Sequence, residues 1–151
     1  MNTFFEITRN RMPHFFNDVS VLEHVPHNKC KTIWHLFHNS NYVVVDPNSD
    51  GIYKITDNSF NVAMSINYFH NTKNYVKELQ DIHRVSSKLV MFSCQAAGND
   101  NPSVENLTEA DFYSNLDIDF MFERHQFDVD YAKSMLYFWG IKRSLSNIDR
   151  V

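Results

Sequence analysis

Residues 42–68 read YVVVDPNSDGIYKITDNSFNVAMSINY, and this stretch decides the predicted fold. The β-branched run 42–45 is typical of a strand, and the polar segment that follows it is typical of a turn. Apolar residues recur in 52–55 and alternate with polar residues in 60–68, and a second polar segment, 56–59, separates the two stretches. Alternation with a period of two places successive side chains on opposite faces of a sheet. The stretch therefore predicts a meander of three antiparallel strands.

Helical patterns lie outside this meander. Apolar residues recur at helical intervals in 30–38, in 73–85 and in the segment that begins at Asp128. Between these segments, the runs 89–94 and 117–122 are typical of strands. Elements in this order favour a mixed sheet covered by helices.

The composition is that of one globular domain. The chain has 151 residues, of which 43 % are hydrophobic and 15 % aromatic, so it can bury a core and is not of the disordered class. No internal repeat and no long polar linker divides it. We therefore expect a single domain over residues 1–151, of the α+β class, with a mixed, mostly antiparallel β-sheet packed against three to four helices.

The charge balance excludes some function classes. Fourteen basic and 18 acidic side chains give a formal charge of −4, spread along the chain, so we expect an acidic surface and no nucleic-acid partner. No apolar run is long enough to span a membrane. Cys30 and Cys94 lie far apart in the sequence and are expected to be reduced thiols. These features predict a soluble, cytoplasmic protein.

A candidate metal site lies in the turn after residue 45. Asp46, Asn48, Asp50 and Asp57 occupy the first, third, fifth and twelfth positions of a calcium-loop pattern, and Gly51 supplies the sharp turn. Asp replaces the bidentate Glu at the last position, and the flanks are predicted strands rather than helices. The alternative is a turn whose Asp and Asn side chains serve local hydrogen bonds.

Residues 51–56, GIYKIT, resemble the opening strand of the GIY-YIG nuclease family. The resemblance implies a second strand carrying Tyr-Ile-Gly further along the chain. Residues 61–66 read NVAMSI and do not supply that motif, so no catalytic residue is carried over.

A candidate ligand pocket lies at the end of the predicted strand 89–94. Cys94 ends this strand and the loop 95–103 follows it, which is where mixed sheets often carry ligand sites. Asn99 in the loop, with His83 or His125 as a base, would complete a site around the Cys94 thiolate. A buried structural thiol is the alternative.

A third group of candidate residues lies near the carboxyl end of the chain. Tyr131, Tyr137 and Trp139 belong to a segment with more aromatic side chains than one helix face can hide, and such residues anchor interfaces. Together with the acidic charge and the lack of a complete catalytic constellation, they favour a non-catalytic protein-binding module of the small bacterial or phage inhibitor or immunity type. Its expected partner is another protein, a homo-oligomer such as a dimer is compatible with it, and no cofactor is expected. The alternative is a small enzyme or ligand-binding domain with its site near Cys94 and the 95–103 loop.

Overall fold

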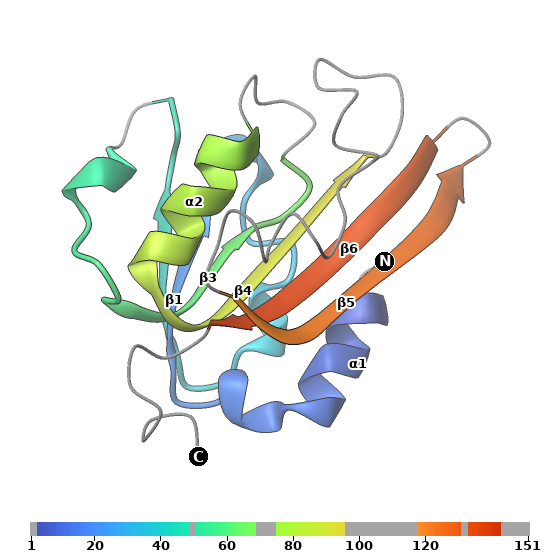
Figure 1. The fold of residues 1–151 in the computed structure, drawn as a ribbon, viewed down its shortest axis with the longest axis horizontal. Coiled ribbons are helices and arrows are strands. Elements are labelled where there is room, and N and C mark those ends of the chain that lie inside the picture. The colour runs from blue at the N-terminus through green and yellow to red at the C-terminus, as the bar shows by residue number, and fades with distance from the viewer. Residues whose placement is uncertain (1–2, 49–50, 69–74, 96–117, 131–132, 143–151) are drawn as a thin grey trace.

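A single six-stranded sheet organises the molecule (Figure 1). The computed structural model describes residues 3–48, 51–68, 75–95, 118–130 and 133–142. The strands lie side by side in the order β2-β1-β3-β4-β6-β5. Their bounds are β1 Ser20–His24, β2 Asn41–Val45, β3 Phe60–Ser65, β4 Ser86–Gln95, β5 Ile118–Asp130 and β6 Lys133–Lys142.

The first four strands are parallel. Strand β1 pairs with β2 on one side and with β3 on the other, and β3 pairs with β4. Only β6 and β5, at the other end of the sheet, are antiparallel to their neighbours. The prediction of a mostly antiparallel sheet was therefore wrong. The meander was wrong for the same reason, because β1 lies between β2 and β3 and the two never pair.

Helices cover both faces of the sheet. α1 (Thr3–Arg11) packs on one face and α2 (Tyr75–Val85) on the other, and these are the two α-helices of the described residues. Residues 73–85 were predicted to form a helix, and α2 confirms this. The expectation of three to four helices is not met in the described part of the chain.

The alternation of side chains along each strand separates two cores. In β1, Leu22 faces the α2 side while Val21 faces the α1 side. In β6, Phe138 faces the α2 side, where its ring stacks on that of Phe92 with 4.4 Å between centroids. Tyr137 faces the other side and meets the rings of α1. Strands that are buried on both faces read as continuous apolar runs in the sequence.

This double burial explains why the last predicted helix was wrong. The segment after Asp128 was expected to be helical, whereas the structure has β5 ending at Asp130 and β6 spanning Lys133–Lys142. A continuously apolar run does not distinguish a buried strand from a buried helix by its periodicity. The strand 89–94 was predicted correctly and forms part of β4.

Between β1 and β2 and between β2 and β3, the described residues form 3-10 turns and no α-helix. Residues 30–38 were predicted to be a helix, but they contain only the 3-10 turn η3 (Trp34–Leu36). The segment that resembles a nuclease strand contains another 3-10 turn, η4 (Ile52–Lys54), so the resemblance does not extend to the structure. The remaining 3-10 turns are η1 (Pro13–Phe15) and η2 (His27–Lys29).

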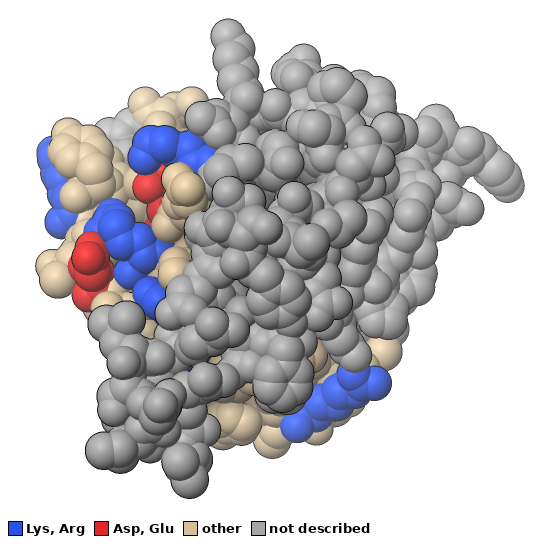
Figure 2. Space-filling view, viewed as in Figure 1, with Lys and Arg blue, Asp and Glu red and all other residues tan. Residues whose placement is uncertain are grey.

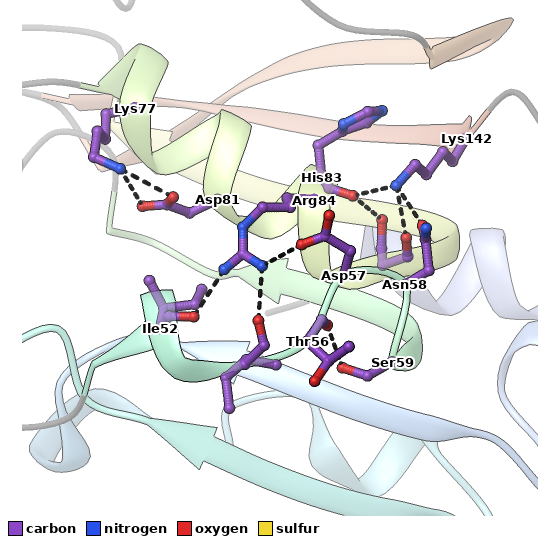
Figure 3. A network of polar contacts seen from close by, with 12 residues as sticks. Ile52, Thr56, Asp57, Asn58, Ser59, Lys77, Asp81, His83, Arg84 and Lys142 are labelled. Atoms are coloured by element: carbon purple, nitrogen blue, oxygen red, sulfur yellow. Dashed lines mark hydrogen bonds and ion pairs between the residues drawn. The ribbon is translucent and has the colours of Figure 1, made fainter. Parts of the chain in front are cut away.

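A polar network fixes η4 to the end of α2 (Figure 3). The guanidinium of Arg84 donates to the carbonyl oxygens of Ile52 and Ile55, at 2.8 and 2.7 Å, and to the carboxylate of Asp57 at 2.6 Å. The ammonium of Lys142, from β6, donates to the carbonyl oxygens of His83 and Ser86 at 2.8 and 2.9 Å. The network ties α2 and β4 to the chain that enters β3.

Candidate functional site

The order of the parallel strands points to one edge of the sheet. After β1 the chain adds β2 on one side, and it then crosses back to add β3 on the other side. In open α/β sheets, ligands bind outside the carboxyl ends of the strands where the order reverses in this way. At this edge lie His24 at the end of β1, Asp46 after β2 and Tyr68 after β3.

Asp46 joins the ends of β1 and β2. One carboxylate oxygen accepts a hydrogen bond from the backbone N–H of His27, in the turn after β1, at 2.9 Å. The other accepts from the backbone N–H of Asn48 at 2.8 Å. These two bonds lower the pKa of the Asp46 carboxyl. The group is therefore a carboxylate at neutral pH, held in a fixed position at the ligand-binding edge.

A buried polar pair lies beside it, on the α2 face of the sheet. Nδ1 of the His24 imidazole is hydrogen-bonded to a carboxylate oxygen of Glu78, from α2, and the two residues are only 4 % and 6 % exposed. Burial raises the pKa of Glu78, and the hydrogen bond to His24 acts in the opposite direction. The hydroxyl of Ser65, at the end of β3, donates to the carbonyl oxygen of His24 at 3.1 Å. The pair therefore links the ends of β1 and β3 to α2.

Tyr68 lies within electrostatic reach of both carboxylates. Partial burial raises the pKa of its phenol, and the charges of Glu78 and Asp46 raise it further. The edge thus brings together an imidazole, two carboxylates and a phenol from four separate segments of the chain.

A second buried carboxylate lies on the opposite face of β1. Glu23 is fully buried, and its Oε1 accepts from the hydroxyl of Tyr42 at 2.6 Å and from the backbone N–H of Lys31 at 2.9 Å. Lys31 adopts a φ of 64°, in the left-handed region, to present that N–H. Burial raises the pKa of Glu23, although both hydrogen bonds oppose the shift. Among the described residues, Glu23 Oε2 has no partner.

The predicted metal ligands do not form one site in the described part of the chain. Asp46 and Asn48 bond to each other as above, whereas Asp57 forms an ion pair with Arg84 in the network at the other end of α2. Asp50 lies outside the described residues. No group of three metal-ligating side chains occurs among the residues that the structure describes.

The predicted pocket around Cys94 is only partly described. Strand β4 carries Cys94 near its carboxyl end, paired in register with Leu136, and Asn99 lies outside the described residues. His83 lies in the last turn of α2, just before β4 begins, and β4 extends roughly 25 Å from its first residue to Cys94. The carbonyl oxygen of His83 accepts from Lys142. His125 lies on β5, opposite Tyr137. The structure therefore does not bring His83 and Cys94 together.

Two of the three predicted interface residues, Tyr137 and Trp139, belong to the core. Tyr137 is 8 % exposed and Trp139 is 5 % exposed, and both lie under the α1 layer. Tyr131 lies outside the described residues. Tyr137 and Trp139 help to fill the space between the sheet and α1, whereas Phe138 packs on the α2 side. The role of Tyr137 and Trp139 as interface residues stays a prediction.

The sequence analysis missed the residues that meet at the ligand-binding edge. Tyr68 and Glu78 were not singled out, and Asp46 was considered only as a calcium ligand. The available signal was the string VLEH, residues 21–24, which places two polar residues directly after a short apolar pair. That pattern is compatible with a buried parallel strand that ends in polar residues.

Solved structures with a similar fold are methyltransferases. A 1,6-didemethyltoxoflavin-N1-methyltransferase of Burkholderia thailandensis, solved with S-adenosylhomocysteine, matches 95 % of this chain over 78 % of its own, with a TM-score of 0.65 and 11 % identity. A phosphoethanolamine N-methyltransferase of Haemonchus contortus, also with S-adenosylhomocysteine, matches 95 % of this chain with a TM-score of 0.64 and 10 % identity. A methyltransferase of Pyrococcus furiosus matches 94 % of this chain over 83 % of its own, with a TM-score of 0.54 and 12 % identity.

These identities establish a shared Rossmann-like fold and nothing finer. The chain spans about half, 53 %, of the Haemonchus protein. No family model matches the sequence, and no curated protein matches it.

Two predictions are corrected by this likeness. The α+β fold class was wrong, since the neighbours have the mostly parallel α/β sheet seen here. The non-catalytic protein-binding module of inhibitor or immunity type was also wrong, because the fold is one that methyltransferases use. Within the described residues, no helix is both long and apolar enough to cross a membrane.

Proposed function

We propose that this chain binds S-adenosylmethionine across the carboxyl ends of β1 and β2 and transfers its methyl group to an acceptor. The observation that supports this proposal most strongly is the position of Asp46, whose carboxylate is fixed at this edge by the N–H groups of His27 and Asn48. The likeness to methyltransferases that were solved with S-adenosylhomocysteine supports the choice of ligand.

The carboxylate of Asp46 suits the ribose of such a ligand. It lies about 20 residues beyond the turn after β1, the spacing at which Rossmann-type folds carry the acidic residue that binds a ribose hydroxyl. Its two oxygens accept backbone hydrogen bonds from His27 and Asn48, and a carboxylate oxygen can accept more than one hydrogen bond. Its lowered pKa keeps it charged, and a charged acceptor forms the stronger hydrogen bonds.

The turn after β1 departs from the glycine-rich form. Residues 25–29 read VPHNK, and the three glycines of the chain lie at other positions. Glycines in this turn allow the backbone to approach a ligand closely. Here the N–H of His27 is already bonded to Asp46, and Pro26 has no N–H to offer. Recognition by this chain therefore depends on side chains at the edge, with Asp46 foremost.

Buried apolar residues at the same edge provide surroundings from which water is excluded. Val25 and Ile66, directly after β1 and β3, are 0 % and 3 % exposed. When bound, S-adenosylmethionine supplies a methyl group on a positively charged sulfur. Apolar surroundings with the fixed carboxylates of Asp46 and Glu78 nearby favour a cationic ligand, because charges interact more strongly where water is excluded.

Calorimetric titration with S-adenosylhomocysteine tests the proposal. We expect saturable binding to the wild-type chain at one site. Asp46→Asn should weaken binding about 10-fold or more, since it removes a charged hydrogen-bond acceptor. Asp57→Asn is the matched control, because it makes the same change on an exposed side chain in the network of Figure 3. A folded wild-type chain that does not bind the ligand, or equal affinities for Asp46→Asn and wild type, would contradict the proposal.

We also propose a cellular location for the protein, and its binding partners remain open to test. A cytoplasmic location fits the free thiol of Cys30, because reducing compartments keep thiols unpaired. The expected protein partner and homo-oligomer stay predictions. The residues alone predict no cofactor, and the proposal departs from that prediction by naming S-adenosylmethionine.

A further inference from the structure

The His24–Glu78 pair has the geometry of an oriented base. The imidazole ends β1 at the ligand-binding edge, and the carboxylate that bonds its Nδ1 comes from the first turn of α2. Both side chains are buried, at 5 % and 7 % exposure. A buried carboxylate bonded to one ring nitrogen is the usual means of fixing an imidazole for proton transfer.

The hydrogen bond determines which nitrogen can act. With Glu78 as a carboxylate, its Oε2 can only accept, and the proton of a neutral His24 imidazole then lies on Nδ1. Nε2 then carries the lone pair. Among the described residues, Nδ1 is the ring nitrogen with a hydrogen-bond partner and no partner of Nε2 is found. Nε2 is therefore left able to accept a proton.

The surroundings stabilise the protonated product of such a step. Asp46, beyond β2, exerts an attractive electrostatic effect on His24, and Glu78 lies in direct contact with it. Tyr68, beyond β3, lies near both carboxylates, and His27 lies in the turn after β1. Asp46 and Glu78 therefore place negative charge close to the imidazole that would receive the proton. An imidazolium formed here needs no counter-ion from solvent.

We infer that His24 is the catalytic base that removes the proton of the methyl acceptor, with Glu78 as the residue that positions it. The acceptor is then an amine, alcohol or phenol, whose attacking nitrogen or oxygen carries a proton that must be lost. This inference rests on the proposed function and names the chemical class of its second substrate.

The atoms and charges balance in this step. The N–H or O–H bond of the acceptor breaks, and its proton moves to Nε2 of His24. The electron pair left on nitrogen or oxygen forms the new bond to the methyl carbon, and the pair of the broken carbon–sulfur bond stays on sulfur. The imidazolium keeps its Nδ1–H bond to Glu78, and the proton leaves Nε2 for solvent afterwards.

Nitrogen NMR of the labelled protein tests the orientation directly, without turnover. With S-adenosylhomocysteine bound at neutral pH, the wild-type chain should show His24 protonated on Nδ1 and unprotonated on Nε2. Glu78→Gln should abolish this preference or reverse it towards the Nε2–H form of free histidine. Glu6→Gln, on α1, is the matched control and should leave the His24 signals unchanged. A wild-type His24 with its proton on Nε2 would overturn the inference.

Methyl transfer provides the second test. Labelled S-adenosylmethionine is incubated with ethanolamine, glycerol and catechol as acceptor probes. His24→Gln should lower the rate on the accepted probe by about 10²–10⁴-fold, the usual contribution of a general base, while S-adenosylhomocysteine still binds. His35→Gln, an exposed imidazole in η3, is the control.

The outcomes separate this inference from the proposed function. Loss of S-adenosylhomocysteine binding in the wild-type chain contradicts the proposed function. Intact binding with undiminished transfer in His24→Gln overturns the inference alone. Intact binding with no transfer to any of the three probes overturns the assigned acceptor class.

Discussion

The imidazole of His24 and the carboxylate of Glu78 meet inside the protein, although 54 residues separate them in the sequence. One residue ends the central strand β1 and the other lies on α2, so the bond fastens the helix to the edge of the sheet where a ligand is expected to bind. The same pair therefore contributes to both stability and the proposed chemistry.

The His24–Glu78 pair should stabilise the folded protein only when both side chains are present. Removing one partner of a buried pair leaves the other without compensation, which costs about 3–5 kcal/mol. We expect Glu78→Ala and His24→Ala each to lower the free energy of unfolding by this order in urea titrations. The double variant His24→Leu with Glu78→Leu should lose less than either single variant. Additive losses would show that the two side chains act independently.

Arg84 should be far more important for stability than its acidic partner. It donates to two main-chain carbonyl oxygens as well as to Asp57, and it is only partly exposed. Arg84→Met should therefore cost about 2–3 kcal/mol. Asp57→Asn should cost less than about 1 kcal/mol, because its side chain is 68 % exposed. Equal losses in the two variants would show that the ion pair, and not the carbonyl bonds, holds η4.

Basic and acidic side chains lie close together on the described part of the surface. On the described part of the face in Figure 2, blue basic and red acidic side chains lie next to one another, in keeping with the pairs Lys77–Asp81 and Arg84–Asp57. Salt screens such exposed pairs, but each pair contributes little to stability. The salt dependence of stability should therefore be small and should not change measurably in Lys77→Gln.

The ring stack between β4 and β6 should be a main contributor to the core. Phe138 is fully buried and stacks on Phe92. Phe138→Ala should cost about 3–5 kcal/mol because it leaves a large cavity. Tyr53→Ala, which removes a ring that is 78 % exposed, should change stability by less than about 0.5 kcal/mol. Thermal unfolding of the two variants, followed by circular dichroism, checks the contrast.

Asp46 and Glu23 should give opposite pH dependences. The pKa of Asp46 in the folded protein is below its ordinary value of 3.8, so its contribution is present above that pH and is lost as the pH falls through the lower value. Asp46→Asn should thus lower the melting temperature at neutral pH, and the difference from wild type should vanish in acid. A difference that persists at low pH would contradict this.

For Glu23 the sign is reversed. Its pKa in the folded protein is above the ordinary value of 4.5, so the wild-type chain loses stability as the pH rises through that window. Glu23→Gln has no such loss, and its melting temperature relative to wild type should rise with pH. Gln retains an acceptor for the Tyr42 hydroxyl and the Lys31 N–H. A relative melting temperature that falls with pH would contradict the shift.

Local patterns predicted some elements but not the arrangement of the sheet. The helix α2 and the strand β4 were predicted because their apolar residues follow one clear period. β6 was taken for a helix because both of its faces are buried, so no polar residue marks its alternation. The parallel pairing was missed because it joins segments that are distant in sequence, and no local period reports on that.

The residues of the candidate site could not be predicted from the sequence for a related reason. β1 contains Glu23 and His24, which look unsuitable for the interior until their partners are known. Those partners are Tyr42 and Lys31 for one, and Glu78 for the other, and all of them come from other elements of the fold. The pairing of Asp46 with the turn after β1 is likewise visible only in three dimensions.

The most direct test of the central claim is an amide NMR titration with S-adenosylhomocysteine. If the ligand binds across the ends of β1 and β2, the amide signals of His27 and Asn48, whose N–H groups are bonded to Asp46, should shift most and saturate together. The amide signals of Lys54 and Asn58, near the other end of α2, should not shift. Unchanged His27 and Asn48 signals in a folded, saturated sample would contradict the account.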